Sequence, residues 1–217
     1  VYKRQTFIKL LCRLYDPTEG EILLNGINIK NYKYDEYMEV FSVVFQDFKL
    51  FDFPLAQNVA TSKTYDRECV MDCLAQVGMD KRVKTMSHGL DTCLFRNFDP
   101  EGIEISGGES QKIALARALY KNAQFIILDE PTAALDPLAE AEVYKNFNSI
   151  VGGKTAVYIS HRLSSCRFCD TIAVFDGGKL VQHGSHNTLV ADDNGKYAEL
   201  WRAQVQYLSL IHISEPT

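Results

Sequence analysis

Residues 125–132 read FIILDEPT, an apolar run that ends in two adjacent carboxylates, Asp129 and Glu130. A strand without a polar face is typical of a parallel sheet that is buried on both sides. An Asp at the carboxyl tip of such a strand can hold Mg²⁺ that is bound to nucleotide phosphates. Because side chains alternate along a strand, Glu130 points elsewhere and can polarise a water. The alternative is that the two acids only begin a solvated loop.

Strands and helices alternate on both sides of this stretch. Strands are predicted at 21–26, 41–45 and 155–160, and a hairpin at 171–175 with 179–182. Helices are predicted at 6–14, 67–77, 108–121, 138–150 and 195–207. This alternation predicts an α/β fold with a mostly parallel sheet, whose ligands bind at the carboxyl ends of the strands. Residues 48–104 are polar and helical where periodic, which predicts an inserted α-helical subdomain.

The composition is that of an ordinary globular protein. The 217 residues are 46% hydrophobic and 24% charged, which excludes disordered, collagen-like and disulfide-scaffold classes. No apolar run approaches the roughly 18 residues of a membrane-spanning helix, and no secretory signal is visible. The net charge of −5 argues against nucleic acid as a partner.

Six cysteines are present, and they include a CxxC pair at 166–169 and a CxxxC pair at 69–73. A zinc site usually needs two tight pairs of ligands, and the spacing of the second pair does not suit one. In a chain without an export signal, these residues are expected to be reduced, structural thiols. Metal or redox chemistry is the alternative.

A second informative stretch is ISGGESQ at residues 105–111, directly before a strong helical pattern. A Ser and two glycines at the start of a helix leave backbone N–H groups free to bind an anion. Glycine also allows the backbone to approach a phosphate closely. A plain helix cap would have a similar composition, but the order of these residues and the following Ala-x-Ala-Arg-Ala pattern are much less common.

Together these segments resemble the motifs of ABC-transporter ATPase domains. Residues 105–109 are similar to the signature motif, usually Leu-Ser-Gly-Gly-Gln, with Ile105 and Glu109 as departures. Residues 125–130 resemble the Walker B motif, 133–136 the D-loop and 159–163 the switch-histidine loop, while Gln46 resembles the Q-loop glutamine. The resemblance implies a P-loop NTPase (RecA-like) core of mostly parallel sheet with an inserted helical subdomain.

The same resemblance implies a role for each matching residue, with ATP and Mg²⁺ as cofactors. Glu130 is the expected general base, Asp129 the expected metal ligand, and Gln46 a further contact to metal or water. His161 is expected to contact the γ-phosphate, although a surface histidine is the alternative. Catalysis of this kind consists of positioning and charge stabilisation.

The remaining implied contacts involve a second copy of the domain. The signature residues Ser106, Gly107 and Gly108 are expected to bind the γ-phosphate of ATP that the facing copy holds. The expected ATP-binding set is completed by three further residues: Thr6, Glu109 and Asp136.

The form of two motifs favours an exporter. The Ser-His-Arg-Leu order at 160–163 and FQDFKLF at 45–51 resemble exporter-type domains, which follow a transmembrane bundle. The implied partners are a second nucleotide-binding domain and a transmembrane domain, fused upstream, at the cytoplasmic face of the plasma membrane. A separate-chain ATPase of an importer or lipoprotein-export system is the alternative. A DNA-repair ATPase needs longer insertions than 48–104, and the acids and His161 argue against a non-enzymatic module.

Both ends of the chain have the pattern of adapter DNA. Residues 1–5 read VYKRQ, and GTG TAT AAG AGA CAG encodes them. The reverse complement, CTG TCT CTT ATA CAC, encodes LSLIH, which stands at 208–212. We therefore expect 1–5 and 208–217 to be scars. The expected domains are then an ATPase core of 6–47 and 105–207, with 48–104 as the helical subdomain.

Two segments depart from the family pattern. The phosphate-binding loop G-x-x-G-x-G-K-[ST] does not occur in the 217 residues, and Thr6 is expected to follow its missing Lys-Ser or Lys-Thr pair. Residues 96–102 read RNFDPEG where many exporters have Val-Gly-Glu-x-Gly, a segment that contacts coupling helices.

We expect residues 1–217 to fold but neither to bind ATP tightly nor to hydrolyse it. The phosphate-loop lysine and its backbone N–H groups normally supply most of the charge that faces the β- and γ-phosphates. Calorimetric titration with Mg-ATP measures this directly. A dissociation constant at or below about 100 μM, which is about −5.5 kcal/mol, would contradict the expectation.

Overall fold

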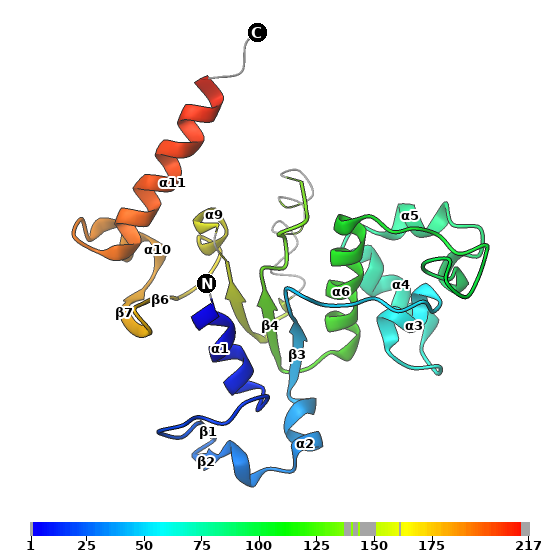
Figure 1. The fold of residues 1–217 in the computed structure, drawn as a ribbon, viewed down its shortest axis with the longest axis horizontal. Coiled ribbons are helices and arrows are strands. Elements are labelled where there is room, and N and C mark those ends of the chain that lie inside the picture. Colours follow the sequence, from blue (N-terminus) through cyan, green and yellow to red (C-terminus); the bar gives the residue numbers. More distant parts are fainter. Residues whose placement is uncertain (1, 137–139, 141–142, 144–150, 161, 214–217) are drawn as a thin grey trace. The chain divides into compact units, whose positions relative to one another are not determined.

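The computed structural model describes residues 2–136, 140, 143, 151–160 and 162–213. The chain is divided into two compact units. The larger unit is Phe7–Ile159, and the smaller one combines Val1–Thr6 with Ser160–Thr217. Figure 1 shows the order of their helices and strands.

A parallel sheet is the centre of the larger unit. Its strand order is β3 (Phe41–Val44), β4 (Phe125–Asp129) and β5 (Thr155–Ile159). Phe41 lies opposite Phe125, and Asp129 lies opposite Ile159, with all three strands parallel. The structure thus confirms the predicted α/β architecture and these three strands, and all their carboxyl ends lie at one edge.

Layers cover both faces of this sheet because β4 has no polar face. Ile126 and Leu128 lie in a large core on one side, with α6 (Gly107–Lys121) and the helices of residues 55–84. Ile127 points to the other side, into a smaller core with residues of α1 (Tyr2–Leu11) and α2 (Tyr34–Glu39). All three β4 side chains are at most 2% exposed.

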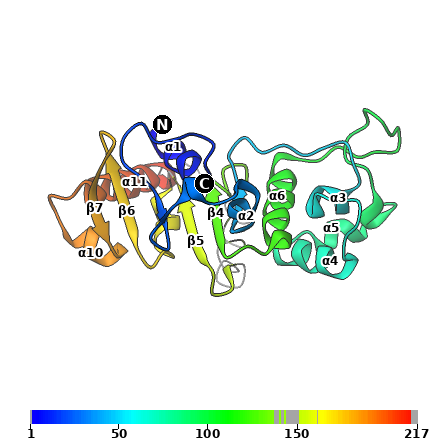
Figure 2. The ribbon, with the colours of Figure 1, turned by 90° about the horizontal axis from the view of Figure 1, so that it is seen from below.

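The segment predicted as helical, 48–104, contains α3 (Leu55–Ala60), α4 (Arg67–Gln76) and α5 (Asp80–Lys84). A short 3-10 helix, η2 (Gly89–Asp91), follows. Both α3 and α4 pack against α6 (Figure 2). The Asp66 carboxylate accepts from the backbone N–H groups of Glu68 and Cys69, which explains why α4 begins at Arg67.

Two predicted boundaries at the start of the chain are wrong. The helix predicted at 6–14 is α1, Tyr2–Leu11, and it stops because Arg13 adopts a left-handed φ of 53°. The strand predicted at 21–26 is only β1 (Leu23–Leu24), which pairs with β2 (Ile27–Asn28). A tight turn with φ of 52° at Asn25 and 77° at Gly26 connects them, and the short 3-10 helix η1 (Ile29–Asn31) follows.

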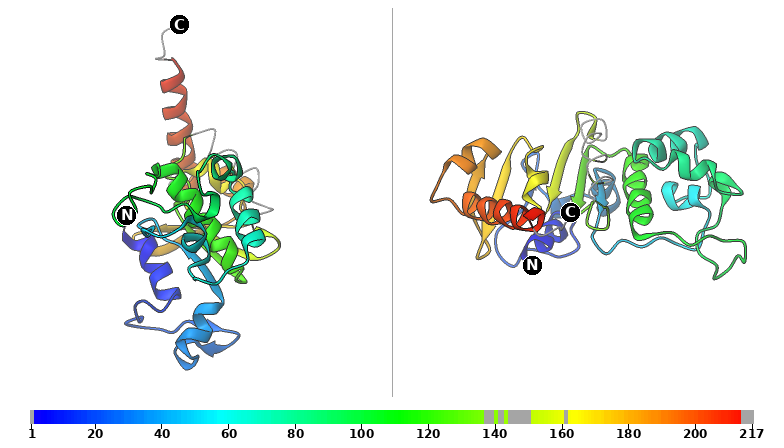
Figure 3. Two further views of the ribbon diagram at one scale, coloured as in Figure 1. Left: turned by 90° about the vertical axis from the view of Figure 1, so that its right-hand side faces the viewer. Right: turned by 90° about the horizontal axis from the view of Figure 1, so that it is seen from above.

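The smaller unit contains the predicted hairpin, as β6 (Ile172–Asp176) and β7 (Lys179–Gly184) (Figure 3). Its helices are α9 (Leu163–Cys166), α10 (His186–Ala191) and α11 (Lys196–Ile213). The helix predicted at 195–207 therefore runs on to Ile213. Most of the helix predicted at 138–150 lies outside the described residues. Within the described part of the chain, no helix is long and apolar enough to span a membrane.

Asn58 is a buried polar residue that fixes the segment between the sheet and α3. Its amide Nδ2 donates to the carbonyls of Phe51 and Phe53, at 2.9 and 3.0 Å. Its Oδ1 accepts from the Phe51 N–H at 2.8 Å. Because the side chain is 0% exposed, water cannot replace these bonds.

Replacing Asn58 by alanine should therefore destabilise the protein by about 2 kcal/mol, since three hydrogen bonds of a buried side chain are lost. Urea unfolding of the variant and the parent measures this difference. The control is Gln57→Ala, on the same helix but half-buried, which should change the free energy of unfolding by about 0.5 kcal/mol or less. Equal effects of the two substitutions would contradict the assignment.

Candidate functional site

Two predicted site residues meet at the carboxyl edge of the parallel sheet. Gln46 follows β3, and Glu130 follows β4. Gln46 Nε2 donates to Glu130 Oε2 at 3.2 Å, although 84 positions separate the residues. The parallel register is the reason, because it brings the ends of neighbouring strands to one edge.

The two adjacent carboxylates have different environments, as the alternation of the strand predicts. Asp129 is the last residue of β4 and is 3% exposed. Glu130 is half-buried, and its side chain reaches Gln46. A buried carboxylate beside a more accessible one is an arrangement that suits a metal ligand and a base, respectively.

The backbone of Glu130 is unusual, with a φ of 50°. A residue other than glycine rarely adopts this left-handed conformation, and the surrounding structure must hold it there. The Glu130 N–H donates to the Ile159 carbonyl at 3.0 Å. Its own carbonyl accepts from Gln111 Nε2 at 2.9 Å. Both peptide groups of Glu130 are thus fixed by neighbouring elements.

The predicted signature segment begins helix α6. Ser106 is the N-cap, and its Oγ accepts from the Glu109 N–H at 3.2 Å. The Glu109 carboxylate accepts from the Ser106 N–H at 3.0 Å, which completes a capping box. Gly107 and Gly108 are the first two residues of the helix, where backbone N–H groups are available to bind an anion. Gly107 is exposed and Gly108 is half-buried.

Glu109 also forms an ion pair with Arg82 of α5, and the distance from Arg82 Nε to Glu109 Oε1 is 2.7 Å. Burial raises the pKa of Glu109, but the bonds from Ser106 and the charge of Arg82 outweigh this effect and leave the pKa below its usual value. No sequence pattern pointed to Arg82 as a residue near the site. Because the same helix also contains Lys81 and Lys84, the sequence does not indicate which of these basic residues contacts Glu109.

Gln111 joins α6 to the turn that follows β4. Its Nε2 donates to the Glu130 carbonyl, and its Oε1 accepts from the Ala134 N–H at 2.8 Å. Sequence reasoning gave Gln111 no role of its own. The available signal was its position, because it lies on the buried helix stripe that continues at Leu115 and Ala118.

The remaining predicted site residues are Asp136, Thr6 and His161. Asp136 is exposed, and its carbonyl accepts from the Glu140 N–H at 2.9 Å. Thr6 is exposed and belongs to the smaller unit, whereas Glu130 belongs to the larger one. His161 lies outside the described residues.

The cysteines are all free thiols. Burial raises the pKa of Cys12 to about 11 and that of Cys73 to about 12, which makes both thiols unreactive. Among the residues that the structure describes, no group of three or more His, Cys, Asp or Glu side chains could hold a metal. Asp129 and Gln46 offer too few donors to enclose a metal ion, but they would suit an ion whose other ligands come from a bound nucleotide.

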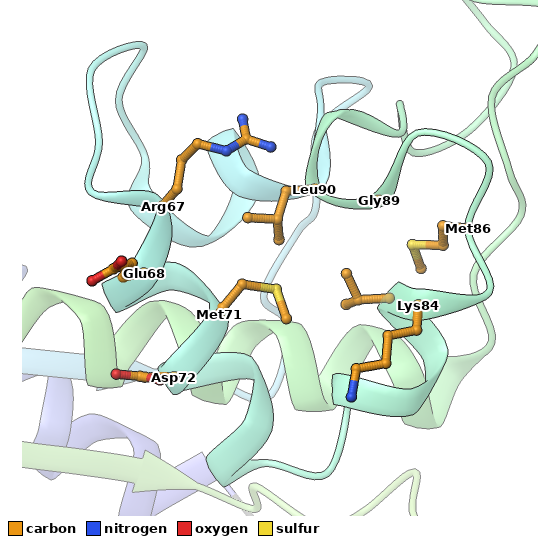
Figure 4. Close-up of a pocket in the computed structure, with 9 residues that line it drawn as sticks. Arg67, Glu68, Met71, Asp72, Lys84, Met86, Gly89 and Leu90 are labelled. Atoms are coloured by element: carbon orange, nitrogen blue, oxygen red, sulfur yellow. The ribbon is translucent and has the colours of Figure 1, made fainter.

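A cavity of about 600 Å³ lies elsewhere, between α4, α5 and η2. Figure 4 shows Met71, Met86 and Leu90 at this cavity, together with charged side chains from α4 and α5. None of the predicted site residues lines it, so the cavity is separate from the edge of the sheet.

Solved and curated proteins resemble this chain over most of its length. "Structure of a bacterial Atm1-family ABC exporter with ATP bound" matches with a TM-score of 0.85 and 32% identity, over 94% of this chain and 35% of that chain. The subtilin transport ATP-binding protein SpaT of Bacillus subtilis is 42% identical over 190 residues, which are 86% of this chain and 31% of SpaT. The ATP-dependent lipid A-core flippase of Burkholderia orbicola (strain AU 1054) is 39% identical over 94% of this chain and 33% of the flippase.

This chain therefore spans about a third of the length of the curated relatives that it matches. The sequence profile of the ABC transporter family matches residues 5–133, which is more than half of the chain. With the parallel sheet, the signature helix and the carboxylates at the sheet edge, the chain belongs to the ABC transporter family and has the α/β fold of its P-loop NTPase domain.

Proposed function

We propose that this chain is the ATP-hydrolysing domain of an ABC exporter, and that ATP held between two copies powers transport across a membrane. The observation that carries this proposal is the contact of Gln46 with Glu130 beside the buried Asp129. These three side chains come from the ends of neighbouring parallel strands, where α/β proteins bind their ligands. The relatives that span three times this length are named as transport proteins, which supports the same conclusion.

In this proposal, Glu130 is the general base and accepts a proton from the attacking water. Gln46 holds the carboxylate through its Nε2 and keeps it at the edge of the sheet. The Glu130 side chain reaches Gln46, whereas Asp129 is buried at the end of β4, so the two carboxylates occupy different positions. A positioned base of this kind contributes about 10²–10⁴ in rate.

Asp129 and the amide oxygen of Gln46 are the donors that we assign to Mg²⁺. One or two carboxylates plus substrate phosphates are the usual ligands of this ion, and the residues fit that pattern. When bound, Mg²⁺ supplies charge that neutralises the phosphates. His161 and Thr6 are assigned to the phosphates from their match to the family motifs.

The signature residues Ser106, Gly107 and Gly108 are assigned to the ATP of the second copy, together with Glu109 and Asp136. The free N–H groups at the start of α6 supply the donors. The negative charge of Glu109 would oppose a nearby phosphate, but Arg82 at 2.7 Å compensates it. The ion pair with Arg82 therefore explains how a glutamate at position 109 can replace the usual glutamine of the signature motif.

A surface of exposed phenylalanines is our assignment for the transmembrane partner. Phe51, Phe53 and Phe98 are 52%, 53% and 83% exposed. The hydrogen bond of Asn97 Nδ2 to Asp52 Oδ1, at 2.7 Å, holds the two segments together. Exposed apolar patches of this kind mark interaction sites. In this proposal the transmembrane partner is fused upstream of the ATPase domain, which consists of the core of 6–47 and 105–207 and the helical subdomain of 48–104. The ATPase domain lies at the cytoplasmic face of the plasma membrane.

The test of this function uses a longer chain, in which a G-x-x-G-x-G-K-[ST] loop precedes Thr6. Glu130→Gln keeps the size of the side chain but removes the base, so steady-state ATP hydrolysis should fall by about 10²–10⁴. ATP should still bind and trap a dimer on size-exclusion chromatography, because Asp129 and the signature helix remain.

The matched control is Glu104→Gln, an exposed carboxylate just before the signature. Its hydrolysis rate should equal that of the parent. If Glu130→Gln retained turnover within about threefold of the parent, Glu130 would not be the base. If the parent itself hydrolysed no ATP, the proposed function would be wrong.

A further inference from the structure

We infer that Gln111 is a positioning residue, which fixes Glu130 through its backbone and ties it to the signature helix. This inference rests on the proposed function, because it concerns the base that we assign to ATP hydrolysis. Gln111 does not touch the reacting groups. It acts through the carbonyl of Glu130 and the N–H of Ala134.

The chemistry of the side chain suits this task. The Gln111 amide is 4% exposed, and it uses both of its ends. Nε2 donates to the Glu130 carbonyl at 2.9 Å, and Oε1 accepts from the Ala134 N–H at 2.8 Å. A primary amide offers a donor and an acceptor side by side, and no apolar or singly charged side chain of this length does so. The network also fixes which way the amide faces, since the opposite orientation would place two oxygens together.

Glu130 needs such support because its φ of 50° is unfavourable for a residue with a side chain. The Ile159 carbonyl of β5 accepts from its N–H, and its own carbonyl accepts from Gln111 Nε2 of α6 and from the Ala133 N–H of the turn, at 3.1 Å. Of the bonds to the Glu130 carbonyl, that from Gln111 joins it to another element, and together these bonds set the direction in which the Glu130 side chain leaves the backbone. The side chain then reaches Gln46 Nε2 at 3.2 Å.

The same end of this helix carries the signature residues. Ser106 caps α6, and Gln111 lies just over one turn further along. The two glycines of the signature also lie against the turn that Gln111 holds. A Cβ on Gly108 would meet the Ala134 carbonyl oxygen and Leu135 Cδ2 at 3.5 Å. The signature glycines, Gln111, the turn at Ala134 and Glu130 are therefore joined by one continuous set of contacts.

Three variants of the longer chain test this inference. Gln111→Met keeps the volume of the side chain and removes both hydrogen bonds. Gln111→Glu keeps the acceptor for the Ala134 N–H, but its carboxylate repels the Glu130 carbonyl. Gln124→Leu is the control, because Gln124 is exposed and directly precedes the opposite end of β4.

We expect kcat for ATP hydrolysis to fall by about 10- to 100-fold in both Gln111 variants, because a misplaced base loses its alignment. KM for ATP should stay within about threefold, since phosphate binding does not use Gln111. Hydrogen exchange at the Ala134 amide should become faster in Gln111→Met and stay slow in Gln111→Glu. The control should match the parent in all three measurements.

Two results with the active longer chain would overturn the inference. One is a kcat within about threefold of the parent in both Gln111 variants. The other is a fall in activity that follows only a lower melting temperature and a smaller folded fraction, which is what a purely structural role produces. If the parent hydrolyses no ATP, the proposed function fails instead. Exchange at Ala134 in residues 1–217 then still decides whether Gln111 holds the turn, and unchanged exchange in Gln111→Met would refute it.

Discussion

The complete burial of β4 is the constraint on which the rest of the larger unit depends. Ile126, Ile127 and Leu128 are each at most 2% exposed, so neither face of the strand can lie against water. The parallel strands β3 and β5 pair with β4 on its two sides, and helices cover both faces of the sheet. Because the three strands are parallel, the residues that follow them lie together at the carboxyl edge of the sheet.

The turn at that edge is the least regular part of the site and also its most constrained part. Glu130 leaves the strand with a left-handed φ, and its two peptide groups bond to β5 and α6. The bonds from two separate elements hold the carboxylate in a position that the chain would not adopt without them.

Helix α6 connects the parts of the larger unit to one another. Its apolar stripe packs on the sheet and on α3 and α4. Arg117, further along the helix, donates from Nε to the Asn58 carbonyl at 2.8 Å and from Nη1 to the Lys49 carbonyl at 3.1 Å. Burial lowers the pKa of Arg117, yet these bonds keep the guanidinium in place. The helix thus links the sheet edge, the helical segment and the signature within one rigid element.

The sequence by itself predicted the buried strand that ends at Asp129, the α/β class and the helix at 108–121, and it placed Asp129 and Glu130 at the end of the strand and Ser106 at a helix cap. These follow from local patterns: an unbroken apolar run, a 3.6-residue stripe and a Ser-Gly-Gly cap. The tertiary structure alone decided the partners of Arg82 and Gln111 and the left-handed backbone of Glu130. Each of these depends on residues from about 20 to more than 25 positions away, brought together by packing, and no local pattern encodes a contact over that separation. The early end of α1 also depended on the left-handed backbone of Arg13, a conformation that arginine adopts only in a specific context. The turn after β1 is different, because Asn25-Gly26 is itself a local signal of a tight hairpin.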